Sequence, residues 1–116
     1  MKQFMLIFRN DFKSEFQQSP EQMQQVMTQW IDWLAGITAE GKMADNGNRL
    51  GSTGKTVRKE LVTDGPFTEI KEIVGGYIIV YGNEVSEAVL IAQKCPILSI
   101  GGSVEVRNVV DINGNA

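Results

Sequence analysis

The sequence has 116 residues, of which 42% are hydrophobic and 22% charged, a balance typical of one globular domain. Its formal net charge of −3 argues against nucleic-acid binding, because there is no excess of basic side chains to neutralise phosphates. The chain contains no histidine and one cysteine, which excludes histidine-based zinc sites, Ser–His and Cys–His catalysis, and an intrachain disulfide.

The beginning of the sequence indicates a cytoplasmic protein. MKQFMLIFRND has one leading lysine and an apolar run that ends at Arg9 and Asp11, which is too short and too soon charged for a signal peptide. No run in the sequence approaches the length of a membrane span. The single Cys95 fits a reducing compartment. We therefore expect a bacterial type of cytoplasmic protein without membrane contact.

A strand and a capped helix are predicted first. KQFMLIF, residues 2–8, is short, apolar and aromatic, as in a buried strand. After a polar segment, Ser19 is a favoured N-cap, Pro20 suits the first helical position, and Gln22 completes a capping box. Gly41 supplies a left-handed stop. Apolar residues at helical spacing predict one face packed on a core: Met23, Val26, Met27, Trp30, Leu34 and Ile37.

Two short strands and a longer one follow. Residues 42–62 alternate loosely and are interrupted by glycines, which predicts two short strands around a glycine-rich bend, the second being KTVRKELV at 55–62. GGYIIVYG, residues 75–82, is rich in β-branched and aromatic side chains and predicts a longer strand. We expect Gly75 and Gly76 to permit close packing or a bulge where that strand begins.

A second helix and a last strand complete the pattern. Asn83 is a suitable N-cap for a helix over 84–95, which Pro96 would end. Cys95 would lie at the helix C-terminus, where the helix dipole disfavours a thiolate, so we interpret it as a packing residue. The strand predicted at 102–110 alternates cleanly, with Val104 and Val106 on one face and Ser103, Glu105 and Arg107 on the other.

This order of elements predicts an α+β fold. A ferredoxin-like antiparallel sheet with two helices on one face accommodates it in a single domain, residues 1–116, with a polar tail at about 111–116. The other face would lack helices, although the strands at 2–8 and 75–82 are apolar. Because an exposed apolar sheet face must be covered, we expect a homodimer that pairs these open faces.

The segment TDGPFTEIKEIVGGYIIVYG concentrates charged side chains directly before the most strand-like run. One interpretation is a solvated connection, in which Asp64 only stiffens the Gly-Pro turn that follows it. The other is the rim of a cleft, in which Phe67 anchors the turn in the core while Asp64, Glu69 and Lys71 converge on one side. The sequence leaves both interpretations open.

The functional hypothesis that follows is a small-molecule cleft in each protomer. If the protein is catalytic, Asp64 would be the base of a proton transfer or elimination on a cyclic or carbonyl compound. Arg49 and Arg107 would each anchor an anionic ligand or pair with a surface glutamate, and Glu105 is a candidate partner for Arg107. The acidic residues match no metal-binding loop, so we expect neither a metal nor a cofactor. The predicted lining residues are Phe4, Leu6, Trp30, Phe67 and Tyr77.

The string VTDGPFTEIKEIVGGY, followed by CP after a helix and then by GSVEVR, resembles the DGPF-type members of the YCII-related family. Gly41, the SPE helix start and the TVR strand fit the same pattern, so the resemblance covers about residues 3–109. It implies a ferredoxin-like protomer that forms a dimeric α+β barrel, similar in shape to muconolactone isomerase. The biochemical role of most members is unassigned.

The resemblance implies two kinds of function. Some relatives look like enzymes that act on ring compounds with a His–Asp pair in a cleft, while DGPF-type proteins are often associated with sigma factors of the extracytoplasmic-function class. This sequence lacks the histidine of the enzyme-like branch and the short turn expected between TVR and ELVTDG. The alternative to a ligand-binding or catalytic cleft is therefore a non-catalytic accessory module of sigma-factor signalling. Whether the protein is an enzyme stays open.

Overall fold

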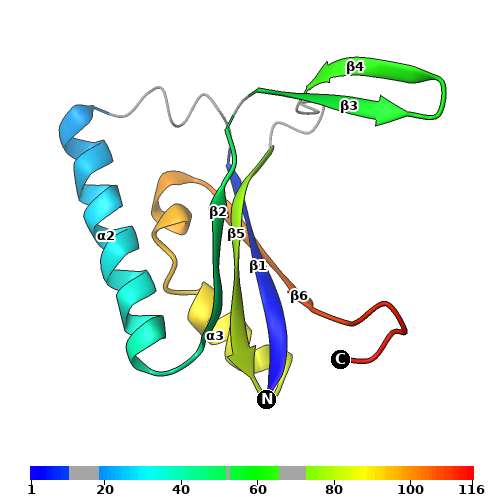
Figure 1. The fold of residues 1–116 in the computed structure, drawn as a ribbon. Helices are drawn as coiled ribbons and strands as arrows, with labels where there is room; N and C mark the ends of the chain where they lie inside the picture. Colours follow the sequence, from blue (N-terminus) through cyan, green and yellow to red (C-terminus); the bar gives the residue numbers. More distant parts are fainter. Residues whose placement is uncertain (11–18, 52, 66–72) are drawn as a thin grey trace.

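The computed structural model describes residues 1–10, 19–51, 53–65 and 73–116. Figure 1 shows the elements in chain order: β1 (Lys2–Asn10), α2 (Pro20–Ala39), β2 (Met43–Arg49), β3 (Gly54–Arg58), β4 (Leu61–Gly65), β5 (Ile73–Gly82), α3 (Val85–Ala92), the 3-10 helix η1 (Pro96–Ile100) and β6 (Ser103–Asn108).

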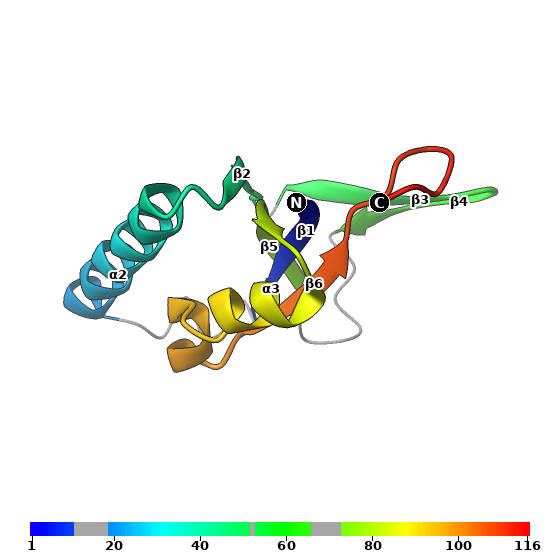
Figure 2. The ribbon, with the colours of Figure 1, turned by 90° about the horizontal axis from the view of Figure 1, so that it is seen from below.

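Four strands form one antiparallel sheet in the order β2-β5-β1-β6, and β3 and β4 form a separate two-stranded hairpin. The helices α2 and α3 and the short η1 lie on one side of the four-stranded sheet (Figure 2). This strand order with two helices on one face is the ferredoxin-like α+β arrangement, so the predicted fold class is confirmed.

Strand β1 lies inside the sheet and separates two environments. Because successive side chains of a strand point to opposite faces, Phe4, Leu6 and Phe8 are buried beneath the helices, whereas Met5 and Ile7 are half-buried on the opposite face. A fully buried leucine stabilises a fold by about 1.5–3 kcal/mol relative to an exposed one. We call the face that carries Met5 and Ile7 the open face.

The predicted limits of the first helix are confirmed. The amide of Gln22 donates to Ser19 Oγ at 3.2 Å, and the amide of Ser19 donates to Gln22 Oε1 at 3.0 Å, which is a capping box. Pro20 occupies the first helical position. After the C-cap residue Glu40, the chain turns at Gly41 with φ of +72°, a conformation that favours glycine.

Only part of the predicted apolar stripe of α2 packs on the core. Ile37 is buried and Leu34 is partly buried, but Met23 and Met27 are 51% and 56% exposed. The N-terminal half of α2 lies farther from the sheet than its C-terminal half (Figures 1 and 2). The prediction of one continuous buried stripe is therefore wrong for the first two turns of the helix.

Three aromatic rings attach α2 to the sheet. The ring of Phe8 meets that of Trp30 edge to face at a centroid distance of 4.8 Å and that of Trp33 at 5.9 Å, and the two tryptophan rings are 5.5 Å apart. Such pairs contribute about 0.5–1.5 kcal/mol beyond the area that they bury. Trp33 Nε1 also donates to the carbonyl of Ile91 at 3.1 Å, which connects α2 to α3.

The strand predicted at 55–62 is instead a hairpin. Strands β3 and β4 pair from Gly54 opposite Gly65 to Arg58 opposite Leu61, and the two residues between them, Lys59 and Glu60, make the turn. Three consecutive charged residues, Arg-Lys-Glu, interrupt the apolar alternation at this point, and a solvated turn accommodates them better than the middle of a strand.

The start and the end of the second helix also differ from the prediction. The N-cap of α3 is Glu84 rather than Asn83, whose amide donates to the carboxylate of Glu87. The helix ends at Ala92, and Pro96 begins η1 instead of stopping α3, because proline suits the first position of a new helical turn.

The two glycines at the start of β5 have different roles. Phe8 pairs with Gly76 and Arg9 pairs with Val74, so Gly75 is the extra residue of a bulge, as predicted. A Cβ atom on Gly76 would lie 2.8 Å from the carbonyl oxygen of Asn48 on β2. A Cβ atom on Gly75 would come no closer than 3.9 Å to its nearest neighbour.

We predict that Gly76→Ala lowers the free energy of unfolding by about 1–3 kcal/mol, because its Cβ would push β2 away from β5. Urea denaturation monitored by tryptophan fluorescence measures this change. Gly75→Ala is the matched control, and we expect its effect to stay within about 0.5 kcal/mol. Equal effects of the two substitutions would contradict the close approach of β2 at Gly76.

Cys95 is a buried core residue, as predicted, although it lies beyond the end of α3. Burial raises the pKa of its thiol to about 12, and a hydrogen bond with the backbone of Ile97 offsets this only partly. A thiol with this pKa is protonated throughout the neutral range, so it is a poor nucleophile in the folded protein.

We predict that Cys95 reacts with Ellman's reagent at pH 8 at least about 100-fold more slowly in the native protein than in urea. Because the pKa is higher in the folded state than in the unfolded state, the thiol leaves stability unchanged at pH 8. It destabilises the fold only as the pH rises above the unfolded pKa toward about 12. Rapid native labelling at pH 8 would show that the thiol is accessible and would contradict its place in the core.

Candidate functional site

The open face of the sheet carries most of the candidate groups that the structure brings together. Strand pairing places Ile7 on β1 between Tyr77 on β5 and Glu105 on β6, and places Met5 between Ile79 and Arg107. Directly paired residues of antiparallel strands point to the same face, so these six side chains share the face opposite the helices. Half-buried apolar side chains therefore lie between a tyrosine on one side and charged groups on the other.

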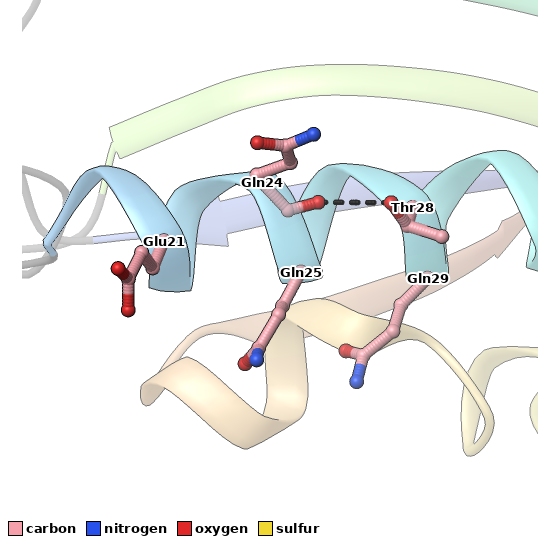
Figure 3. A pocket seen from close by; sticks show the side chains of 5 residues that line it. All are labelled: Glu21, Gln24, Gln25, Thr28 and Gln29. Carbon is pink, nitrogen blue, oxygen red and sulfur yellow. Dashed lines mark hydrogen bonds between the residues drawn. The ribbon is translucent and has the colours of Figure 1, made fainter.

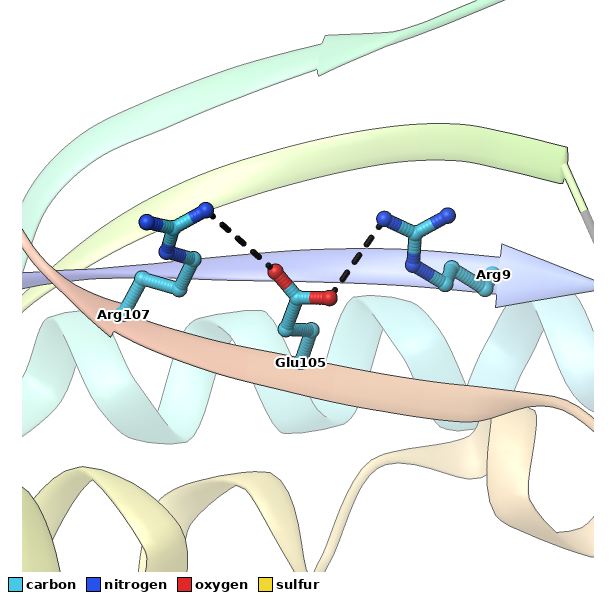
Figure 4. Close-up of polar contacts among 3 residues, drawn as sticks. All are labelled: Arg9, Glu105 and Arg107. Atoms are coloured by element: carbon cyan, nitrogen blue, oxygen red, sulfur yellow. Dashed lines mark hydrogen bonds and ion pairs between the residues drawn. The ribbon is translucent and has the colours of Figure 1, made fainter.

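Two arginines flank one carboxylate on this face (Figure 4). Arg9 Nη2 donates to Glu105 Oε1 at 3.4 Å, and Arg107 Nη1 lies 3.9 Å from Glu105 Oε2. The side chains of Arg9 and Glu105 are 33% and 40% exposed, and that of Arg107 is 71% exposed. We call Arg9, Glu105 and Arg107 the arginine cluster. Its formal charge is +1.

The predicted pairing of Glu105 with Arg107 is confirmed, but sequence analysis missed Arg9. A signal was present, because the alternation of β1 puts Arg9 on the same face as Met5 and Ile7. What the sequence did not show is the neighbour of β1. Only the pairing of β1 with β6 brings the Arg9 guanidinium to Glu105, which is 96 residues away in the chain.

A second polar contact lies on the other side of the apolar residues. Asn48 Nδ2 on β2 donates to the hydroxyl oxygen of Tyr77 at 3.2 Å, which leaves the hydroxyl proton of Tyr77 available to an acceptor. Asn48 was not predicted as a site residue, since the sequence did not indicate that β2 would lie beside β5. The open face thus offers donors at two places, separated by Ile7.

The remaining predicted site residues do not join this cluster. Trp30 packs on Phe8 beneath the helices, on the face opposite Tyr77, so the structure does not bring these two predicted lining residues together. Phe4 and Leu6 are buried under the same helices. Arg49 is exposed at the end of β2.

Asp64, the predicted base, lies on the hairpin strand β4. Its carboxylate accepts a hydrogen bond from Lys55 Nζ at 2.8 Å and is 96% exposed. Phe67, Glu69 and Lys71 lie outside the described residues. The role of Asp64 as a base and the cleft rim at 63–72 therefore stay predictions.

A shallow concavity lies along the first half of α2 (Figure 3). Its lining comes from one helix and is polar and exposed, and the hydroxyl of Thr28 donates to the carbonyl of Gln24 at 3.0 Å. It contains none of the predicted site residues, and no apolar wall encloses it, so we assign no function to it. The lining residues are Glu21, Gln24, Gln25, Thr28 and Gln29.

Neither a metal-binding group nor a membrane-spanning helix is found in the part of the chain that the structure describes. No three acidic or cysteine side chains there lie together as ligands of an ion. No described helix has both the length and the hydropathy that crossing a bilayer requires.

Comparison with known proteins identifies a family. The fold is similar to that of 5-chloro-2-hydroxyhydroquinone dehydrochlorinase from Burkholderia phenoliruptrix AC1100, solved in complex with 2,5-dihydroxybenzoquinone, with a TM-score of 0.49 and 17% sequence identity over 97% of this chain and 99% of that chain. No curated protein matches the sequence. The YCII-related domain, by contrast, matches residues 3–113, which is nearly the whole chain, and the protein therefore belongs to the YCII-related family.

Proposed function

We propose that the protein binds a small anionic compound with an apolar or aromatic body on the open face of its sheet. The observation that carries this proposal is the arginine cluster. Two guanidinium groups share the single carboxylate of Glu105 at the edge of a half-buried apolar surface. Arg107 had been predicted as a ligand-binding residue, as had Tyr77 on the same face.

The arginine cluster is better suited to binding an anion than to stabilising the fold. Exposed ion pairs contribute only about 0–1 kcal/mol to stability. Each guanidinium has five N–H donors, and the two ion pairs with Glu105 engage one nitrogen of each. A ligand carboxylate could therefore take up further donors of Arg9 and Arg107, in the bidentate geometry that arginine favours.

The apolar side chains beside the cluster favour a ligand with an apolar body. Met5, Ile7 and Ile79 are half-buried and lie between the arginine cluster and Tyr77. A ring placed on these side chains would direct its charged group toward Arg107 and a polar substituent toward the Tyr77 hydroxyl. An aromatic carboxylate has this combination of groups.

We also propose that a second copy of the chain covers the open face. One face of a single open sheet cannot enclose a ligand, since binding sites for small molecules are concave and mostly apolar. The pairing of two open faces, as the family resemblance implies, would supply the opposite wall. Each arginine cluster would then be enclosed between two sheets, where water is largely excluded and charge-assisted hydrogen bonds are stronger.

Catalysis is not required by this proposal. Asp64 remains a predicted base for proton transfer or elimination, and its ion pair with Lys55 shows that a cation already lies next to it. The association with a sigma factor of the extracytoplasmic-function class likewise remains a prediction from the family resemblance.

We predict that benzoate and its hydroxylated derivatives bind the protein and that Arg9→Gln weakens this binding by about 10- to 100-fold, the effect of losing one charge-assisted hydrogen bond. Isothermal titration calorimetry at low ionic strength measures both dissociation constants. Lys94→Gln, which removes the same charge from an exposed position two residues beyond the end of α3, is the control and should bind like the wild type. Failure of every aromatic carboxylate to bind, or equal weakening by both variants, would contradict the proposed site.

We predict that the wild-type protein sediments at micromolar concentration with twice its chain mass of 12.8 kDa. Ile7→Lys should give a folded monomer, because the new charge would lie in the middle of the paired open faces. Leu90→Asp, on the exposed side of α3, should leave the dimer intact. A wild-type chain that sediments only as a 12.8 kDa species would rule out the pairing.

A further inference from the structure

The hairpin formed by β3 and β4 is an extension with its own two-stranded sheet. Its strands pair with each other over five positions, and it is not part of the four-stranded sheet. It begins beyond one end of the four-stranded sheet and extends away from it (Figure 1). A two-stranded hairpin is only marginally stable in water by itself, so this extension needs a surface to pack on.

The hairpin exposes apolar side chains that would benefit from such a surface. Val57 and Val62 lie directly opposite each other, and their exposed fractions are 74% and 56%. Leu61, next to the turn, is also 56% exposed, but it pairs with Arg58 and points to the opposite face of the hairpin. Single exposed apolar residues are common on proteins, but the cross-strand pair of Val57 and Val62 presents a continuous apolar surface on one face of the hairpin, which indicates an interaction site.

The direction of the hairpin identifies its partner. It extends on the side of the open face, away from α2 and α3 (Figure 2). If two open faces pair about a two-fold axis, a hairpin that extends on the open side of each sheet would lie beside the other protomer. The same rotation that covers the open face therefore gives the hairpin a surface to pack on.

Charge favours the same partner. The hairpin carries three basic residues (Lys55, Arg58 and Lys59) and two acidic ones (Glu60 and Asp64), so its net charge is +1. The whole chain has a net charge of −3, which leaves −4 on the rest of the chain. A positive hairpin is thus attracted to the negative body of a second copy.

We propose that the β3–β4 hairpin is an arm that contacts the second protomer of the dimer through Val57 and Val62. This inference goes beyond ligand binding, but it rests on the proposed pairing of the open faces. Each arm would bury its apolar side chains on the partner, so the two arms would stabilise the dimer through two equivalent contacts.

We predict that Val57→Asp/Val62→Asp raises the dimer dissociation constant at least about tenfold while far-ultraviolet circular dichroism of the monomer stays unchanged. Sedimentation equilibrium over a range of concentrations measures the constant. Leu90→Asp is the control, since it likewise puts an aspartate in place of an exposed apolar side chain, 62% exposed on α3, and it should leave the constant unchanged. If the double variant has the same dimer dissociation constant as the wild type, the proposed contact of the arm is wrong, but the pairing of the open faces is not affected. A wild-type chain that does not dimerise would overturn both.

A spin label at the hairpin turn tests the contact directly and does not depend on the stability of a variant. In Lys59→Cys, the new thiol is exposed, whereas Cys95 is buried and has a raised pKa, so labelling is selective. Mixed dimers of spin-labelled protein and unlabelled, ¹⁵N-enriched protein should show broadened amide signals in the enriched partner. Amide signals of the enriched partner that stay sharp, although mixed dimers have formed, would show that the arm does not contact the other protomer and would overturn the proposal.

Discussion

The period-two alternation of β1 is the constraint on which the rest of this structure depends. Each side chain of β1 must face either the helices or the open side, and the strand is paired on both edges, with β5 and β6. The large apolar residues Phe4, Leu6 and Phe8 take the helical side, and Phe8 meets both tryptophans of α2 there. A shift of register by one residue would exchange these three with Met5, Ile7 and Arg9 and would expose the core.

The same constraint assembles the candidate binding surface. Once Phe8 points to the helices, Arg9 must point to the open face, and pairing with β6 places Glu105 and Arg107 next to it. The apolar surface between this cluster and Tyr77 consists of the side chains of β1 and β5 that point away from the helices and the core. The site is therefore the outer side of the sheet that holds the core together.

Two surfaces of the single chain are apolar and incompletely covered, and both lie on the same side of the molecule. One is the open face around Ile7, and the other is the hairpin patch around Val57. A dimer that buries both would account for the exposed hairpin without a further partner. It would also explain how so open a protomer can enclose a small ligand.

The sequence by itself determined the local structure and the fold class. Ser19, Pro20, Gln22 and Gly41 set the limits of α2. Apolar, β-branched and aromatic runs marked β1 and β5, and alternation marked β6, because caps and such patterns depend only on residues close together in the chain. The local pattern gave a wrong prediction at 55–62, where one strand was expected and a solvated turn divides the segment into two paired strands. It also failed at Met23 and Met27, where the helix leaves the sheet.

Only the tertiary structure decided which side chains share a surface. Arg9 meets Glu105, and Tyr77 meets Asn48, through the strand order β2-β5-β1-β6, which no single segment encodes. Trp30 and Tyr77, both predicted to line one cleft, lie on opposite faces for the same reason. Strand neighbours are set by contacts between distant parts of the chain, so the sequence could indicate the residue types of a binding site but not which of them would lie together.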